Sequence, residues 1–259
     1  MKRCRLITIA FSHYCEKARW ALDRLAVPYD EEPHLPVFHW TASFRSGGRR
    51  TVPVLISDER VLPDSTDILL YLDERAPERA KLYPEEPGER RRCTELEDLF
   101  DRRLGPATRR LAYYHLLPSR ELTLEMLRGP RSGPSWERRV AGPAYPVLSA
   151  LLRRGLRIDR AGAERSRQVI DEMFEDVGAR LRGGRPYLLG DRFSAADLTF
   201  AALAAPVVQP PEYGFELPAL ERSPREAADL VRRQRHTEAG RFALRLYETE
   251  RKTVIRGAA

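Results

Sequence analysis

The sequence predicts a two-domain protein, with an α/β domain at the N-terminus and an all-α domain after it. Over residues 1–76, short runs rich in β-branched residues alternate with segments of helical period, whereas every periodic segment in residues 89–259 is helical. Between them, residues 77–88 are rich in proline and charge and follow no regular pattern, which is typical of a linker. The 259 residues are enough for both domains to have a hydrophobic core.

The predicted N-terminal elements follow from local patterns. Leu6, Ile7 and Ile9 form a short apolar run that predicts a buried strand, and residues 15–26 carry one apolar stripe at helical spacing. In order, we expect strand 5–10, helix 15–26, strand 29–34, a loop with one helical turn at 36–50, strand 52–56, a strand from 61 and a helix from 64. This β-α-β-loop-β-β-α order is that of a thioredoxin-like sheet.

The second domain is predicted to contain helices alone. We expect them at 93–117, near 146–156, and at 163–181, 194–205 and 225–247. Residues 128–146 hold seven glycines and prolines, which predicts a long irregular insert. The stretch from 118 to 160 matches no recognisable pattern. Trp136, within the insert, could close over a site as a lid.

The net charge of +7 raises the question of a nucleic-acid partner, but its arrangement argues against one. Only four of the 45 basic residues are lysines, and the arginines are spread over the chain among Asp and Glu. A surface that follows phosphates would concentrate them and interleave aromatic residues. We therefore expect no nucleic-acid partner, and a positive field that favours a small anionic ligand over a cationic one.

Cysteine content and hydropathy favour a cytoplasmic protein. Cys4, Cys15 and Cys93 are a sparse, odd set, as expected in a reducing compartment. The longest apolar stretch, residues 198–208, is about half the roughly 20 residues that a membrane-spanning helix needs, so no membrane partner is predicted. Only residues 6–11 follow the charged start as an apolar run, so we expect no secretory signal. The histidines show no ligand spacing with Cys or carboxylates, so we expect no metal.

The loop Ser12-His13-Tyr14-Cys15 lies between a predicted strand and the start of a helix. A helix N-terminus presents unpaired N–H groups and partial positive charge, so it stabilises an anion such as a thiolate. The Ser12 hydroxyl can add a hydrogen bond to that anion. The simpler alternative is that Ser12 only caps the helix and Cys15 packs in the core.

Two further motifs extend this loop into a candidate binding site. Val52-Pro53 precedes a strand; if the bond is cis, free backbone groups can pair with a bound peptide, and the alternative is a trans proline on an edge strand. Asp64-Ser65 opens a helix, where hydroxyl and N–H groups suit a carboxylate and Asp64 suits an ammonium. An ordinary helix cap would look the same.

Taken in order, these three motifs over residues 3–75 resemble the N-terminal domain of the glutathione S-transferase superfamily, and residues 11–20 are similar to its bacterial, serine- and cysteine-type branches. A fourth motif at residues 189–199 resembles the family's capping box, with Ser194 as N-cap and Asp197 three residues on.

The resemblance implies roles for the motif residues. Ser12 would be the catalytic residue that activates the thiol of glutathione, or of another low-molecular-weight thiol. Val52, Pro53, Asp64 and Ser65 would bind the rest of that cosubstrate. Cys15, the only thiol in the loop, is a further candidate for the thiol site, although its place in the helix favours inward packing. For the glycyl carboxylate, no motif decides between His39, Arg49 and Arg50.

A second substrate would lie between this loop and the helical domain. The candidate pocket residues are His13, Tyr14, Arg109, Tyr113 and Tyr114. The chain is thus expected to be a transferase, active in detoxification, that directs a glutathione thiolate at an electrophilic small molecule, and the family implies a homodimer. Two alternatives stay open: a thiol-disulfide or deglutathionylating reductase acting through Cys15, and a non-catalytic scaffold that binds ligands or partners.

Overall fold

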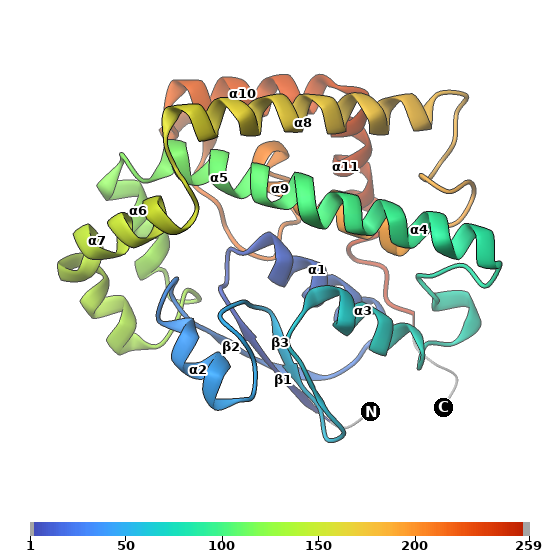
Figure 1. Cartoon of the computed structure of the whole chain (residues 1–259), viewed down its shortest axis with the longest axis horizontal. Coiled ribbons are helices and arrows are strands. Elements are labelled where there is room, and N and C mark those ends of the chain that lie inside the picture. Colours follow the sequence, from blue (N-terminus) through green and yellow to red (C-terminus); the bar gives the residue numbers. More distant parts are fainter. Residues whose placement is uncertain (1–2, 256–259) are drawn as a thin grey trace.

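The computed structural model describes residues 3–255 and places a small sheet below a layer of helices (Figure 1). Its four strands are β1 (Cys4–Thr8), β2 (Tyr29–Pro33), β3 (Val54–Ile56) and β4 (Val61–Leu62), in the order β2-β1-β3-β4. Strand β1 runs parallel to β2 and antiparallel to β3, and Leu6 lies opposite Leu55. This mixed sheet confirms the predicted thioredoxin-like domain.

Three helices accompany the sheet: α1 (His13–Arg24), α2 (His39–Arg45) and α3 (Ser65–Asp73). Helices α1 and α3 lie between the sheet and the helical domain (Figure 1). The α1 side chains Trp20, Ala21 and Leu22 are fully buried. The start of α1 therefore lies where the two domains meet.

The remaining elements are helical, which confirms the predicted all-α second domain. They are α4 (Pro87–Leu99), the π-helical segment η2 (Phe100–Leu104), α5 (Gly105–Leu116), α6 (Arg120–Arg128), α7 (Ser135–Gly155), α8 (Arg160–Leu181), α9 (Ala195–Val208), α10 (Arg225–His236) and α11 (Glu238–Thr249), with short 3-10 turns at Glu78–Ala80 and Leu220–Arg222. Helix α9 is the centre of this domain, because nearly all its side chains are buried and it contacts α1, α4, α5 and α11.

The predicted capping box at the start of α9 is present. Asp197 Oδ2 accepts hydrogen bonds from the Ser194 N–H (2.9 Å) and the Ser194 hydroxyl (2.6 Å), and Oδ1 accepts from the Leu188 N–H (2.8 Å). These bonds satisfy backbone groups that would otherwise be buried without partners.

The prediction of an irregular insert at residues 128–146 is wrong for most of that segment. Helix α7 runs through Pro143 and Pro146, and only residues 129–134 between α6 and α7 are irregular. Each proline removes one helical hydrogen bond, but Ala141, Tyr145 and Leu148 are buried in one cluster with residues of α6. Tertiary packing therefore outweighs the local cost of the prolines.

Three smaller expectations also need correction. Helix α2 has seven residues where one turn was expected. The single helix expected at 225–247 is two, because the Thr237 hydroxyl accepts from the Gly240 N–H (2.9 Å) and caps α11. The helix expected at 93–117 begins earlier, at Pro87 within the predicted linker, and contains the π-helical segment η2. Over residues 3–255, no helix combines the length and apolarity needed to cross a membrane.

Candidate functional site

A cavity of about 1070 Å³ opens between the loop before α1, the segment before β3, the start of α3 and the helical domain. It brings together most of the residues predicted from sequence. Those that line it are Ser12, His13, Tyr14, His39, Arg50, Val52, Pro53, Asp64, Ser65, Arg109 and Tyr113. Four candidates do not line it: Cys15, Arg49, Tyr114 and Trp136. Trp136 instead packs edge-on against Phe38, with centroids 5.6 Å apart, and is half exposed.

Ser12 is the N-cap residue of α1, with extended backbone angles (φ −76°, ψ 127°). Its backbone is bonded on both sides, since its N–H donates to Ile9 O (2.8 Å) and its carbonyl accepts from the Glu16 N–H (2.9 Å). Its side chain makes no capping bond and lines the cavity. The hydroxyl is thus placed beside the amide end of the helix without being used to cap it.

Cys15 lies one turn into α1 and is fully buried. Burial raises the pKa of its thiol to about 11, against smaller lowering effects of Arg19, the Ile9 backbone and a hydrogen bond with Ser12. The side chain therefore stays protonated at neutral pH and packs into the core. Its position gives no support to the prediction that Cys15 contacts a guest thiol, because the thiol does not reach the cavity surface.

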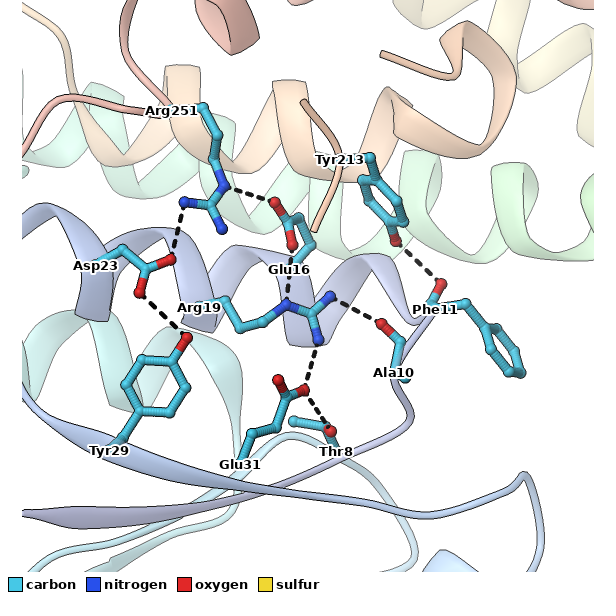
Figure 2. A network of polar contacts seen from close by, with 10 residues as sticks. All are labelled: Thr8, Ala10, Phe11, Glu16, Arg19, Asp23, Tyr29, Glu31, Tyr213 and Arg251. Atoms are coloured by element: carbon cyan, nitrogen blue, oxygen red, sulfur yellow. Dashed lines mark hydrogen bonds and ion pairs between the residues drawn. The ribbon is translucent and has the colours of Figure 1, made fainter. Parts of the chain in front are cut away.

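Two long-range hydrogen bonds hold the loop that carries Ser12 (Figure 2). Arg19 Nη2 donates to the Ala10 carbonyl (2.9 Å), and the Tyr213 hydroxyl donates to the Phe11 carbonyl (3.0 Å). Both carbonyls directly precede Ser12, so the backbone leading into the site is fixed from α1 on one side and from the chain after α9 on the other.

Arg19 is in turn held by carboxylates (Figure 2). Its Nε pairs with Glu16 (3.0 Å) and its Nη1 with Glu31 (2.8 Å). Burial alone would lower the pKa of Arg19, but Glu16 and Glu31 outweigh it and raise that pKa, so the cation is permanent. Arg251, near the end of the described chain, adds a second cation to Glu16 (2.7 Å) and also pairs with Asp23 (2.9 Å). Sequence patterns do not reveal this network, because among its ion pairs only Glu16 and Arg19 are at helical spacing, whereas Arg251 is 235 positions from Glu16.

His13 and Tyr14 connect the loop to the helical domain. His13 Nε2 donates to the Gly105 carbonyl (2.9 Å), and the Tyr14 hydroxyl donates to the Asp101 carbonyl (2.8 Å). Burial and the nearby Arg109 charge lower the pKa of His13 to about 3, so the imidazole is neutral. A neutral ring that is already donating to a carbonyl positions the loop and does not accept the thiol's proton through that nitrogen.

The two other predicted motifs meet the same cavity. The Val52-Pro53 bond is cis, and Val52 lies outside the β3 ladder, which begins at Val54. Asp64 caps α3, with Oδ1 accepting from the Thr66 N–H (2.8 Å). Ser65 is nearly buried, at 3% exposure, and no hydrogen bond occupies its hydroxyl within the described chain.

A buried charge cluster that sequence patterns miss lies beneath the start of α3. Lys17 is fully buried and pairs with Asp101 (2.7 Å) and Glu97 (2.8 Å), while also donating to the Thr66 hydroxyl (3.1 Å). Burial on its own would lower the pKa of Lys17, but the two carboxylates raise it. The cluster joins α1, α3, α4 and η2 and so fixes the two sides of the cavity relative to each other. Its only sequence signal is that Lys17 is one of four lysines.

Among residues 3–255, no group of three or more His, Cys, Asp or Glu side chains is arranged to hold a metal ion.

In comparisons with known proteins, this chain matches two protein-family models. The model described as the N-terminal domain of glutathione S-transferase matches residues 6–80, and that of the C-terminal domain matches residues 160–233. Together they cover more than half of the chain. A search of curated protein sequences gives no match.

Solved structures show the same fold at low sequence identity. A glutathione S-transferase from Ceriporiopsis subvermispora in complex with glutathione is 16% identical, with a TM-score of 0.65 over 98% of this chain and 99% of its own. A glutathione transferase family member from Pseudomonas fluorescens, with two glutathione bound, is 15% identical, with a TM-score of 0.60 over 96% and 90%. A glutathione transferase from Burkholderia graminis, with two glutathione molecules per subunit, is 19% identical, with a TM-score of 0.58 over 96% and 84%.

Proposed function

This chain belongs to the glutathione S-transferase superfamily, and on that premise we propose that it is an enzyme that activates the thiol of glutathione, or of a related small thiol, for attack on an electrophilic small molecule. The observation that carries the proposal is the position of Ser12. It lies at the N-terminus of α1 and lines the cavity, and its hydroxyl makes no capping hydrogen bond to the helix.

Activation here means lowering the pKa of the guest thiol. Taking a thiol from about 8.5 to below 7 needs roughly 2 kcal/mol of preference for the thiolate. The Ser12 O–H donates to the guest sulfur, and the free N–H groups of the first turn of α1 add positive potential. The thiol proton leaves to solvent. The thiolate then forms a C–S bond with the electrophile, which loses its leaving group or takes up a proton.

The rest of the guest would be held by groups that surround Ser12. The Val52 backbone is free to pair with the cysteinyl unit, and the Ser65 hydroxyl and the amide end of α3 suit the γ-glutamyl carboxylate. Asp64 lines the cavity and suits the ammonium group. Of the three candidates for the glycyl carboxylate, His39 is bonded to the Arg50 carbonyl (3.0 Å) and Arg49 lies off the cavity, which favours Arg50.

No observation favours either of the two alternatives, a reductase acting through Cys15 or a non-catalytic scaffold. A reductase acting through Cys15 needs an accessible thiolate, whereas Cys15 is buried with a raised pKa. Within residues 3–255 the cysteines form no disulfide and are buried, which supports a reducing, cytoplasmic setting. The homodimer implied by the family stays a prediction, as does the role in detoxification.

The test measures thiol binding and thiolate formation separately. Calorimetric titration of the chain with glutathione gives affinity, and the pH dependence of the ultraviolet thiolate absorbance of the bound complex gives the thiol pKa. We expect Ser12→Ala to keep most of the affinity, to raise the pKa of the bound thiol toward 8.5, and to lower turnover of a generic electrophile by up to about 25-fold at pH 6.5.

Ser46→Ala is the matched control, because Ser46 lies at the end of α2 and does not line the cavity. If glutathione binds but Ser12→Ala leaves the thiol pKa unchanged, the assigned role of Ser12 is wrong. If neither glutathione nor other cellular thiols bind, the proposed function itself is wrong.

A further inference from the structure

Carboxylates and arginines both line the cavity, and they are unevenly distributed along the chain. All four lining carboxylates, Asp64, Asp67, Asp98 and Asp101, come from α3, α4 and η2 or their caps. From residue 105 onward, the described residues that line the cavity include no Asp or Glu, but they include Arg109 and Arg154. The carboxylates suit the ammonium group of the thiol proposed above. Arg109 and Arg154 have no counterpart in that part of the thiol.

Arg109 is a cation without an anionic partner. It projects from α5 into the cavity, and its guanidinium carbon lies 5.9 Å from the centre of the Tyr14 ring. Within residues 3–255 it makes no hydrogen bond or ion pair, and its Nε is buried with no acceptor. The adjacent Arg110 differs, since it donates to the Leu156 carbonyl (2.9 Å) and to Ser166 (2.8 Å). Burying the Nε–H of a guanidinium without a partner is costly, so an anionic guest would stabilise Arg109.

Tyr113 lies one turn after Arg109, on the same face of α5. Its hydroxyl also meets the cavity and makes no hydrogen bond within the described chain. Burial raises the pKa of Tyr113 to about 12, against a lowering effect of Arg109, so the hydroxyl remains a donor at neutral pH. The helix therefore presents a guanidinium fork and a hydroxyl together, which is a donor set suited to a carboxylate.

The walls around these donors are apolar. Leu122 and Met126 of α6, Leu152 of α7, and Leu230 and Val231 of α10 line the same cavity, and α6 and α10 both contact α5. Such a site favours a guest with an apolar body and a single anionic group.

We propose that the second substrate is an apolar carboxylate, an aromatic or long-chain acid, whose carboxylate is bound by Arg109 and Tyr113. The inference rests on the proposed function and adds the substrate class to it. Arg109 and Tyr113 orient the electrophile and take no part in bond making. For a chloromethyl aryl acid, the thiolate forms the C–S bond, the C–Cl bond breaks, and chloride leaves.

Binding of unreactive probes tests the proposal without turnover. The chain, saturated with glutathione, is titrated by calorimetry with para-butylbenzoate and with its neutral amide, para-butylbenzamide. We expect the acid to bind at least tenfold more tightly than the amide. Arg109→Gln should remove this preference, and Tyr113→Phe should reduce it about threefold, because each variant removes donors to a charged acceptor.

Arg180→Gln is the control for the general positive field of the chain. Arg180 is a surface residue of α8 that pairs with Asp176 (2.8 Å) and lies away from the cavity. It removes the same single charge and should leave the acid-to-amide ratio unchanged. Turnover of para-(chloromethyl)benzoate should show the same pattern in KM, with kcat little changed.

Equal affinity of the unmodified chain for acid and amide overturns the proposal, as does an undiminished preference in Arg109→Gln. Glutathione binding is measured in each variant, so the two proposals fail separately. Absence of glutathione binding contradicts the proposed function, whereas normal glutathione binding with no preference for the acid contradicts only the substrate class.

Discussion

Ser12 and Cys15 lie three residues apart at the start of α1, yet their surroundings differ. The Ser12 hydroxyl lines the cavity, whereas the Cys15 thiol is fully buried and its pKa is raised to about 11 by that burial. A sequence pattern of Ser-x-x-Cys does not decide which of the two side chains meets the ligand. The direction of the helix relative to the sheet decides it, and that direction is a tertiary property.

The three cysteines are therefore expected to be unreactive in the folded protein. Cys4, Cys15 and Cys93 are all buried, and burial raises the pKa of each, so little thiolate is present at pH 7. A thiol-reactive chromogenic disulfide should modify far less than one equivalent in minutes, and all three after unfolding in denaturant. Rapid, stoichiometric modification of Cys15 in the folded chain would restore the reductase alternative.

The residues of the candidate site fall into two groups: those that a local sequence motif predicts and those that it does not. Ser12, Val52-Pro53 and Asp64-Ser65 lie in short motifs whose chemistry is local, and all of them meet the cavity. The residues that hold the loop cannot be predicted in this way. Tyr213 reaches the Phe11 carbonyl across 202 positions of sequence, and no local pattern marks a tyrosine for such a bond.

At the scale of elements, the junction of η2 and α5 is shaped by Tyr14, in the first turn of α1. The Tyr14 hydroxyl donates to the Asp101 carbonyl, and a Cβ on Gly105 would lie 2.7 Å from Tyr14 Cζ and in collision with the hydroxyl. The π-helical segment at Phe100–Leu104 places this glycine against the loop. π-Helical segments are frequent at functional sites. The apolar spacing of residues 93–117 predicts one uninterrupted α-helix. The wider π-helical turn escapes this prediction, because one extra residue in a single turn disturbs the spacing too little to be noticed.

Gly105→Ala is expected to destabilise the protein despite the higher helix propensity of alanine. The added methyl displaces Tyr14 and breaks its bond to Asp101, and overpacking of this kind costs about 1–3 kcal/mol. Chemical denaturation gives the free energy of unfolding. Gly178→Ala in α8 is the comparison, because its Cβ would meet atoms no closer than 3.5 Å, and it should be neutral or slightly stabilising. If the two variants had equal free energies of unfolding, the Tyr14 side chain would be able to move away from the added methyl group at no cost.

Helix α7 is docked to the sheet domain by a contact that depends on pH. His34 Nδ1 lies 2.5 Å from Glu137 Oε1, while Glu137 Oε2 accepts from the Leu35 N–H (2.8 Å). Burial alone would lower the pKa of His34, but hydrogen bonds and charges of Glu137 and Glu32 outweigh it and raise that pKa above 6.5. Because the folded state then binds the proton more tightly than the unfolded state, the pair stabilises the fold below about pH 6.5, and this contribution is lost as pH rises through the raised pKa.

The free energy of unfolding should therefore fall as the pH rises from 6 through the raised pKa of His34, and Glu137→Gln should flatten this part of the curve. At pH 6 the variant should also be less stable by about 2 kcal/mol, since a hydrogen bond to a charged group is lost. Glu121→Gln, an exposed position on α6, should leave the curve unchanged. An identical slope in Glu137→Gln and the parent would show that His34 does not titrate in this window.

For the whole molecule, the sequence predicts the two-domain arrangement well, because the periodic patterns of residues 1–76 and 89–259 differ in kind. It fails for α7, where two prolines and several glycines indicate a break that packing of Tyr145 and Leu148 overrides. It also cannot reveal that the last described helix and the turn after it return to α1. Arg24 pairs with Glu250 (2.9 Å), and the Ile255 N–H donates to the Arg24 carbonyl (2.6 Å).

Arg251 is the residue through which this return should influence the site. Its guanidinium pairs with Glu16, which is fully buried and also holds Arg19, the donor to the Ala10 carbonyl (Figure 2). Arg251→Ala leaves Glu16 with one cation where it had two, and loss of a buried partner is strongly destabilising. Because Arg19 remains, we expect a loss of about 3 kcal/mol in the free energy of unfolding, at the lower end of what such losses cost.

The same variant should raise the pKa of the bound glutathione thiol, because Arg19 can move toward the unshared Glu16 and loosen the backbone that leads into Ser12. Lys252→Ala is the matched control. The Lys252 side chain is 74% exposed, and its Nζ comes no closer than 3.9 Å to Glu212 Oε1, so this ion pair is weak. Neither stability nor the thiol pKa should change in this variant. Denaturation and the thiolate absorbance titration, run on both variants, separate the two effects. If Arg251→Ala loses stability but leaves the thiol pKa unchanged, the tail stabilises α1 without positioning the loop. If it behaves like Lys252→Ala in both measurements, the buried pairing with Glu16 does not support the fold.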